Sequence, residues 1–174
     1  PWPLNEGLVT LECHRDLPLD FQARHLSAMG LVDDIIISNC FATEEELASI
    51  ERIDRSKVQL RPALDAGITE NERTVASYAK HKVRGDVSPY LLRSTWSRVE
   101  FANLDIPARP VGRGLVRGDV VVVNNESPRY KGELQLVLQD MPDDGTRNVI
   151  GTLPAHERML LDYLDSWSRF DILL

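Results

Sequence analysis

Residues 8–53 follow the order strand, helix, strand, helix, and a unit of this size and order cannot bury a hydrophobic core by itself. Residues 8–11 are a short strand candidate. Residues 34–38 are a run rich in β-branched side chains, which suits a strand buried on both faces. The two strands start about 26 residues apart, as in a βαβ repeat. The chain begins Pro1-Trp2-Pro3 without a start methionine, so we expect a fragment of a larger parallel α/β structure.

Local signals predict the two helices of this segment. The first covers residues 21–29, with Asp20 as its N-cap and Gly30 at its C-terminal stop. The second begins after Thr43, which forms a capping box with Glu46. Its apolar stripe consists of Leu47, Ile50 and Ile53.

The composition limits the class of protein. Hydrophobic residues make up 43% and charged residues 27% of the 174 residues, which is ordinary for a globular chain. A net charge of −7 argues against broad contact with nucleic acid, and no apolar run reaches the roughly 20 residues that cross a bilayer. Cys13 and Cys40 form neither a disulfide framework nor a closely spaced zinc pair, so we interpret them as free thiols. We expect a cytoplasmic protein that binds neither nucleic acid nor membrane, without metal or cofactor.

The loops after the two predicted strands carry polar residues. Glu12, His14 and Arg15 offer an acid, a titratable imidazole and an anion clamp within four residues, and Ser38 and Asn39 follow the second strand. In an eight-stranded α/β barrel such loops hold the active site. The alternative is a solvated charged loop.

The second part of the chain is rich in strands. The pattern predicts strands at residues 120–123, 133–138, 148–151 and 170–174 and helices after the capping box at residues 69–72 and at residues 156–164. This order favours a compact antiparallel β-barrel with capping helices. We therefore divide the chain into domains at residues 1–54 and 55–174.

Arginines and carboxylates gather in two stretches of this second domain. The first stretch holds Arg84, Asp86, Arg93, Ser94 and Arg98, and the second, around a predicted turn at residues 128–132, holds Arg129 and Tyr130, with Glu133 after it. Guanidinium groups match the geometry of carboxylate and phosphate, so these residues are candidates for an anion site in one cleft. The alternatives are surface ion pairs for the first stretch and an ordinary hairpin turn for the second.

The motifs together resemble one family. The matching segments are residues 10–15, 30–37 and 43–47 in the first domain and residues 84–86, 92–98, 118–119, 129–134 and 147–151 in the second. They resemble the bacterial 6-phospho-N-acetylmuramidase family along nearly the whole chain. The resemblance implies the last two βα units of a TIM barrel, followed by a cyclophilin-like β-barrel.

The resemblance also implies a function. Members are cytosolic glycosidases that cleave 6-phospho-MurNAc-GlcNAc during peptidoglycan recycling, and the arginines named above would bind the phosphate and the lactyl carboxylate of this disaccharide. The two catalytic carboxyl groups are expected upstream of residue 1, so this chain alone should be inactive and should need the preceding barrel portion. The sequence does not determine the oligomeric state, and a homodimer is one of the alternatives. The competing interpretation is a non-catalytic ligand-binding or interaction module.

Overall fold

The computed structural model describes residues 9–37, 42–86 and 88–174. The chain divides into two compact units, Pro1–Arg55 and Ser56–Leu174, which we call unit 1 and unit 2. Each unit is considered by itself. Among the described residues, no helix is both long and apolar enough to span a membrane.

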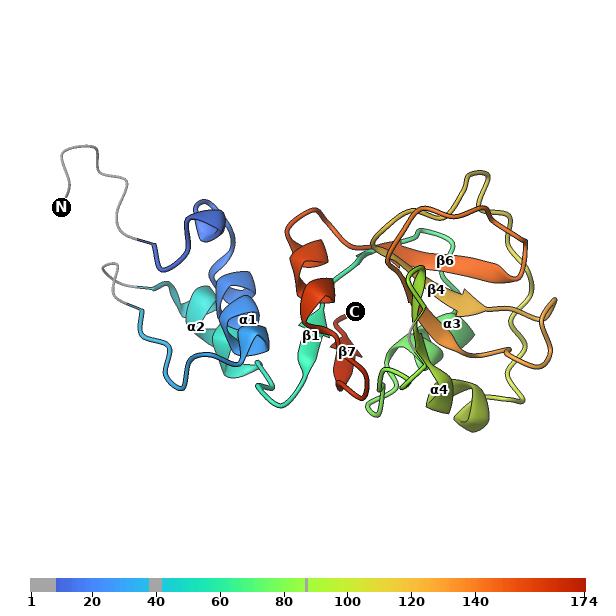
Figure 1. Cartoon of the computed structure of the whole chain (residues 1–174), viewed down its shortest axis with the longest axis horizontal. Coiled ribbons are helices and arrows are strands. Elements are labelled where there is room, and N and C mark those ends of the chain that lie inside the picture. The colour runs from blue at the N-terminus through green and yellow to red at the C-terminus, as the bar shows by residue number, and fades with distance from the viewer. Residues whose placement is uncertain (1–8, 38–41, 87) are drawn as a thin grey trace. The chain divides into compact units, whose positions relative to one another are not determined.

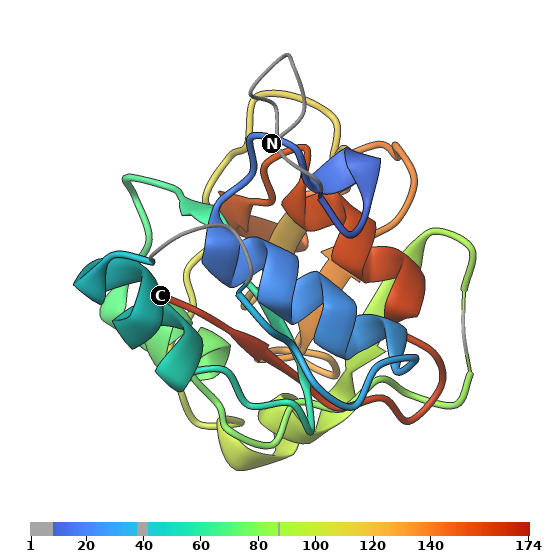
Figure 2. The ribbon, with the colours of Figure 1, turned by 90° about the vertical axis from the view of Figure 1, so that its left-hand side faces the viewer.

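Unit 1 contains the short 3-10 helix η1 (Glu12–His14) and the helices α1 (Leu19–Met29) and α2 (Glu44–Glu51). Figure 1 shows them in blue to teal, and Figure 2 views them from another side. The stop at Gly30 is confirmed, since this residue closes α1 in the left-handed conformation with φ 64°. The N-cap prediction is wrong. Pro18 occupies that position, and Asp20 lies in the first turn, where its carboxylate accepts a hydrogen bond from Arg24 at 3.2 Å.

The capping box of α2 is confirmed. The Thr43 hydroxyl accepts from the Glu46 backbone N–H at 3.2 Å, and the Glu46 carboxylate accepts from the Thr43 N–H at 2.8 Å. Residues 9–11 and 34–37 are the described parts of the two strands predicted for unit 1, and they form no strand. A strand is defined by hydrogen bonds to a neighbouring strand. Among the described residues, none of unit 1 supplies that neighbour. Ser38, Asn39 and Cys40 lie outside the described residues.

Unit 2 is built on a five-stranded antiparallel sheet with the order β2-β6-β4-β5-β3. Its strands are β2 (Ala63–Leu64), β3 (Leu91–Ser94), β4 (Asp119–Val123), β5 (Leu134–Val137) and β6 (Arg147–Thr152). A separate parallel pair joins β1 (Val58–Leu60) to β7 (Phe170–Ile172). The predictions of β4, β5, β6 and β7 are confirmed, whereas β1, β2 and β3 had not been predicted.

The closed barrel predicted for unit 2 is wrong. The edge strands of the sheet are β2 and β3, and these two strands do not pair with each other. The physical reason is length: β2 contributes only two residues to its ladder with β6, and the other strands that could continue the sheet, β1 and β7, pair with one another instead. Unit 2 is therefore a mixed α/β structure around open sheets.

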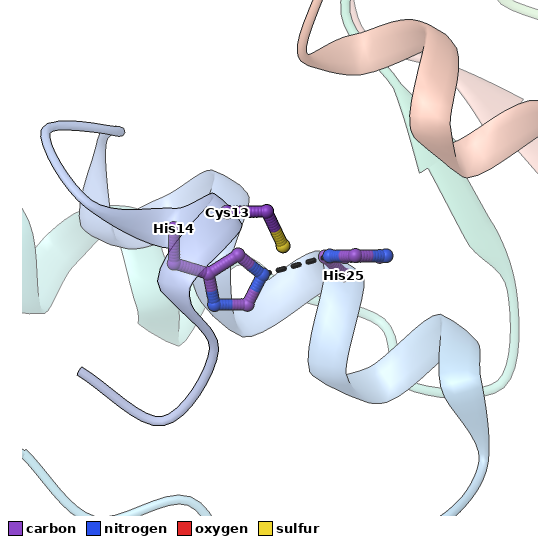
Figure 3. Close-up of side chains that lie close together, drawn as sticks. All are labelled: Cys13, His14 and His25. Atoms are coloured by element: carbon purple, nitrogen blue, oxygen red, sulfur yellow. Dashed lines mark hydrogen bonds between the residues drawn. The ribbon is translucent and has the colours of Figure 1, made fainter.

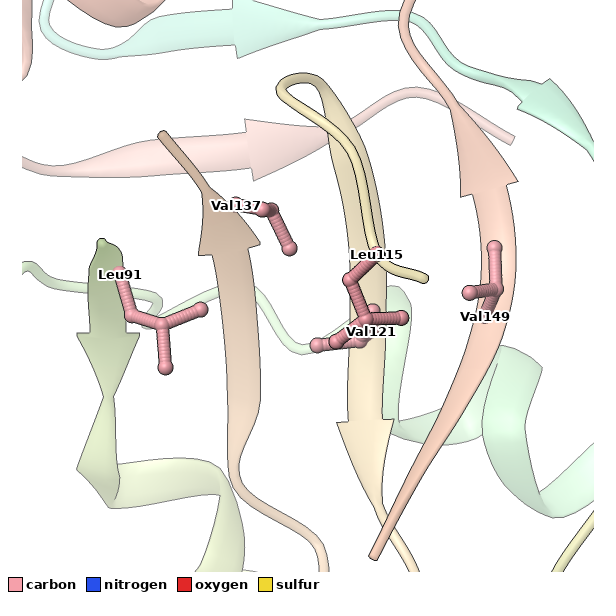
Figure 4. Packing of buried hydrophobic residues seen from close by; sticks show 5 residues of the cluster. All are labelled: Leu91, Leu115, Val121, Val137 and Val149. Atoms are coloured by element: carbon pink, nitrogen blue, oxygen red, sulfur yellow. The ribbon is translucent and has the colours of Figure 1, made fainter. Parts of the chain in front are cut away.

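Both faces of the sheet are buried. On one face Leu91, Val121, Val137 and Val149 from the four neighbouring strands β3, β4, β5 and β6 pack together with Leu115 (Figure 4). Helices α3 (Glu70–Ala76) and α4 (Thr95–Glu100) and the 3-10 helix η2 (Glu157–Tyr163) complete the unit. The capping box of α3 is confirmed, with Thr69 and Glu72 as partners.

Candidate functional site

Tyr130 is surrounded by three guanidinium groups. The Cζ atoms of Arg93, Arg98 and Arg129 lie 5.2, 5.1 and 5.6 Å from the centre of its ring. The arginines come from β3, from α4 and from the loop between β4 and β5. A ring face attracts cations, and this attraction holds the three side chains near one another.

The loop that carries Tyr130 is closed by backbone hydrogen bonds. Val123 donates to the Glu133 carbonyl at 3.0 Å, and Gly132 donates to the Val123 carbonyl at 2.9 Å. Gly132 has φ 78°, and a Cβ at this position would lie 3.4 Å from the Arg98 Cα atom in α4. Glycine therefore permits the turn, whereas the space beside α4 would accept a Cβ in ordinary van der Waals contact.

Glu133 is the buried carboxylate that holds the arginines around Tyr130 in place. Its carboxylate is fully buried and accepts hydrogen bonds from Arg93 Nε at 2.7 Å, from Gln135 Nε2 at 2.8 Å and from the Thr95 hydroxyl at 3.1 Å. Arg98 Nε lies 3.9 Å from the same carboxylate. Burial alone would lower the pKa of Arg93, but the hydrogen bond and the charge of Glu133 outweigh it and raise that pKa. Arg93 is thus a permanent cation held in one orientation.

Arg84 and Asp86 form a neighbouring pair. Arg84 donates two hydrogen bonds of 2.6 Å to the Asp86 carboxylate, and its backbone N–H donates to the Arg93 carbonyl. Desolvation raises the pKa of Asp86, but the bonds and charge of Arg84, with the charge of Arg93, lower it overall. The pair is internally neutral, so its free capacity to bind an anion is smaller than that of the arginines around Tyr130.

A pocket of about 270 Å³ adjoins this cluster. Arg93, Tyr130, Gln135 and Arg147 contribute to its wall. Arg147 Nε donates to the Gln135 side-chain oxygen at 2.9 Å, and its Nη1 donates to Asp144 at 2.7 Å. Desolvation opposes ionisation of Asp144, yet the hydrogen bonds from Thr146 and Arg147 lower its pKa to about 2.

The alternation of the strands explains why the polar wall forms here. In β3, β5 and β6 a polar residue stands two positions from a member of the apolar cluster: Arg93 from Leu91, Gln135 from Val137, and Arg147 from Val149. Residues two apart point to the same face of a sheet. One face is therefore apolar over part of its length and polar at one end.

Gln135 and Arg147 were not among the residues predicted from the sequence. The signal that could have found them is the strand register, in which Gln135 lies opposite Arg93 and Arg147 opposite Val123. A sequence pattern gives the face of each strand but not this register.

Ser94 lies on the other face of β3. Its fully buried hydroxyl is 2.8 Å from His81 Nδ1, while His81 Nε2 lies 3.0 Å from the Val75 carbonyl. Because a carbonyl only accepts, His81 carries its proton on Nε2, and Ser94 donates to Nδ1. The structure therefore brings together Arg93, Arg98, Arg129, Tyr130 and Glu133, with Arg84 and Asp86 beside them, but turns the Ser94 side chain away.

The three candidates of unit 1 separate into two arrangements. Glu12 and Arg15 form a bidentate ion pair, with Arg15 Nε 2.6 Å from one carboxylate oxygen and Nη2 2.9 Å from the other. His14 is fully buried, and its Nε2 is 2.7 Å from His25 Nδ1. His14 is therefore hydrogen-bonded to His25, whereas Glu12 and Arg15 are hydrogen-bonded to each other.

A group of potential metal ligands surrounds His14. The exposed Cys13 and the buried His14 and His25 each offer one ligand atom, and these atoms all lie within 4.8 Å of one another (Figure 3). Burial, with the neighbouring His25, lowers the pKa of His14, and burial lowers that of His25. Sequence reasoning missed this group because Cys13 and His14 are 11 or more residues from His25, and only packing joins them.

Comparisons with known proteins cover the whole chain. A family model described as "6-phospho-N-acetylmuramidase, N-terminal" matches residues 1–52, and one described as "6-phospho-N-acetylmuramidase, C-terminal" matches residues 58–173. No curated protein matches the chain.

Two solved structures are similar. A crystal structure of an uncharacterized B. cereus protein is 41% identical, with a TM-score of 0.91, over 100% of this chain and 50% of that chain. A crystal structure of a conserved Enterococcus faecalis protein of unknown function is 24% identical, with a TM-score of 0.67, over 99% of this chain and 46% of that chain. The second likeness concerns the fold alone. The chain spans about half the length of each.

Proposed function

This chain belongs to the 6-phospho-N-acetylmuramidase family, and from that membership we propose that it is part of a glycoside hydrolase for 6-phospho-MurNAc-GlcNAc. In this proposal the enzyme works in the cytoplasm on fragments from peptidoglycan recycling. Unit 2 contributes contacts to the anionic groups of the substrate. The phosphate and the lactyl carboxylate are the two such groups of the sugar.

The observation that carries the proposal is the charge around Tyr130. Arg93, Arg98 and Arg129 bring three positive charges, whereas Glu133 brings one negative charge. Like charges at this separation repel one another unless a counter-charge is present. A bound phosphate or carboxylate supplies that counter-charge and accepts the guanidinium donors that Glu133 leaves free.

The dimensions of the pocket indicate which part of the substrate it takes. Sites that enclose a drug-sized ligand measure roughly 300–1,000 Å³, and the pocket beside Tyr130 measures about 270 Å³. It suits one charged end of a disaccharide rather than the whole molecule. Arg147 and Gln135 on its wall are therefore proposed as additional contacts.

We further propose that residues 1–54 are the last two βα units of a TIM barrel and that unit 2 is a cyclophilin-like C-terminal domain with the open sheet described above. The boundary between these domains is supported because the two family models meet within residues 52–58, where the two compact units also meet. In this proposal the catalytic carboxyl pair belongs to the half of the family length that this chain does not cover. The chain alone then has no glycosidase activity.

A titration of the 174-residue chain tests the anion site directly. The probes are 6-phospho-N-acetylmuramic acid, N-acetylmuramic acid without the phosphate, and N-acetylglucosamine, which has neither anion. Each charge-assisted hydrogen bond contributes roughly 1.5–3 kcal/mol, so loss of the phosphate should weaken binding by at least about tenfold. Equal affinity for all three sugars would contradict the proposal.

A second measurement concerns the reaction. The longer protein that contains this chain should hydrolyse the phosphorylated disaccharide, and the 174-residue chain should not. Specific phosphosugar binding without hydrolysis by the longer protein would instead favour a non-catalytic binding module.

A further inference from the structure

Cys13, His14 and His25 bring a thiol and two imidazoles together in unit 1. The ligand atoms lie within 4.8 Å of one another, and Figure 3 shows the Cys13 sulfur and the His25 ring on the same side of the His14 ring. His14 and His25 are 0% and 4% exposed, while Cys13 is exposed. Two of the three candidate ligands are therefore buried, and the third is exposed to solvent.

We propose that these three residues form a binding site for a divalent transition-metal cation of the zinc class. Thiolate sulfur and imidazole nitrogen are the ligands that zinc prefers. Three protein ligands with one position left open describe a zinc site that keeps access to water.

The distances are close to those that such a cation needs. With zinc–sulfur bonds of about 2.3 Å and zinc–nitrogen bonds of about 2.0–2.1 Å in a tetrahedron, the ligand atoms stand roughly 3.3–3.6 Å apart. The two histidine nitrogens, now 2.7 Å apart, must separate by roughly 0.6 Å, and ligand atoms as much as 4.8 Å apart must approach by up to roughly 1.2 Å. Side-chain rotations of this size leave the backbone of η1 and α1 in place.

Coordination fixes the protonation of the three ligands. An imidazole binds a cation through the lone pair of an unprotonated ring nitrogen, so both histidines coordinate as uncharged rings. On binding, the Cys13 S–H bond breaks, its proton goes to solvent and a sulfur–metal bond forms. Whichever ring donates the His14–His25 hydrogen bond, its proton moves to the other nitrogen of that ring when the bonded nitrogen coordinates the metal.

Cobalt(II) is the probe that reports on both ligand type and geometry. We would titrate it into the full 174-residue chain carrying Cys40→Ser. The sequence has two cysteines, so Cys13 is then the one that remains. A thiolate-to-cobalt charge-transfer band with the visible bands of tetrahedral cobalt is expected, and zinc(II) should displace both. No sugar is present, so failure here leaves the proposed function untouched.

Three variants in this background complete the test. Cys13→Ser should abolish the charge-transfer band. His25→Ala should weaken cobalt binding by more than about 100-fold, since changing even an outer partner of a ligand costs 10–100-fold. His156→Asn, a histidine of unit 2, is the matched control and should bind as the parent does.

Circular dichroism would verify that each variant is folded. Should His25→Ala unfold, His25→Gln keeps a side chain that can hydrogen bond to His14 but binds these cations poorly. A folded parent without the charge-transfer band, or a band that persists in Cys13→Ser, would overturn the site. Unchanged affinity in the folded His25 variant would do so as well.

Discussion

The buried carboxylate of Glu133 accepts a hydrogen bond of 2.7 Å from Nε of Arg93, whose side chain is 22% exposed. The pair joins the interior of unit 2 to its surface, because one partner is enclosed and the other reaches the pocket. Glu133 fixes one edge of the guanidinium and leaves its remaining donors for a ligand. Removal of the Glu133 carboxylate should therefore destabilise the folded protein even when no ligand is present.

Glu133→Gln should destabilise the protein by roughly 3 kcal/mol, the lower end of the range for breaking a buried ion pair, because Arg93 is partly exposed. The amide would also bring N–H groups toward the donors of Gln135 and Arg93. Urea unfolding of the variant and the parent measures the difference. Glu126→Gln, on the exposed part of the same loop, is the control and should have no effect. An unchanged midpoint for Glu133→Gln would show that the carboxylate does not organise the cluster.

Arg129→Ala should weaken binding of 6-phospho-N-acetylmuramic acid by roughly 1.5–3 kcal/mol, the range for a hydrogen bond to a charged group. Arg129 is exposed, and the backbone carbonyl through which it accepts from Arg98 remains in the variant, so the melting temperature should change little. Calorimetric titration and a thermal scan measure the two quantities.

The control for Arg129 is Arg117→Ala. Arg117 pairs with the exposed Asp162 at 2.7 Å and is not one of the three arginines around the Tyr130 ring. Its loss should leave sugar binding unchanged. Equal weakening by both variants would mean that the effect is one of net charge and not of a site.

Stability should fall in mild acid because of His81. This buried ring stacks on Phe170, and burial lowers its pKa from 6.5 to about 4 despite its bond to the Val75 carbonyl. Between pH 6.5 and 4 the unfolded chain binds a proton that the folded chain does not, so stability decreases as pH falls. The full effect is up to about 3 kcal/mol.

Unfolding by urea at several pH values, for the parent and for His81→Gln, isolates this contribution. His14 and His25 also have lowered pKa values and add to the slope in both proteins, so the difference between the slopes belongs to His81. Parallel slopes for parent and variant would refute the assignment.

The sequence predicted features that depend on neighbouring residues. The capping boxes at Thr43 and Thr69 require only residues three positions apart, and the hairpin around Tyr130 requires one turn between a valine run and an alternating strand. The strands expected at residues 8–11 and 34–38 depend on partners elsewhere, and their described residues form no strand. Propensity proposes a strand, but pairing makes it one.

Contacts between distant segments lay beyond sequence reasoning for the same reason. The pairing of β1 with β7 closes a loop of more than 100 residues, and the position of Gln135 beside Arg93 depends on a register. His25 meets His14 through the packing of α1 against η1. No local pattern encodes these relations, whereas the clustering of arginines around Tyr130 could be anticipated from charge and residue type.

Unit 2 should fold without unit 1. Residues 56–174 contain the five-stranded sheet, the β1–β7 pair and the apolar cluster of Figure 4, and a chain of this length suffices for one core. A protein of residues 56–174 should therefore unfold in one cooperative transition when followed by circular dichroism. A shorter protein of residues 66–174 is the matched comparison. It lacks β1 and β2, so β7 loses its partner and Leu60, which is fully buried, is removed; this protein should be much less stable or unfolded. If residues 56–174 gave no cooperative transition under conditions where the whole chain does, the core of unit 2 would depend on unit 1.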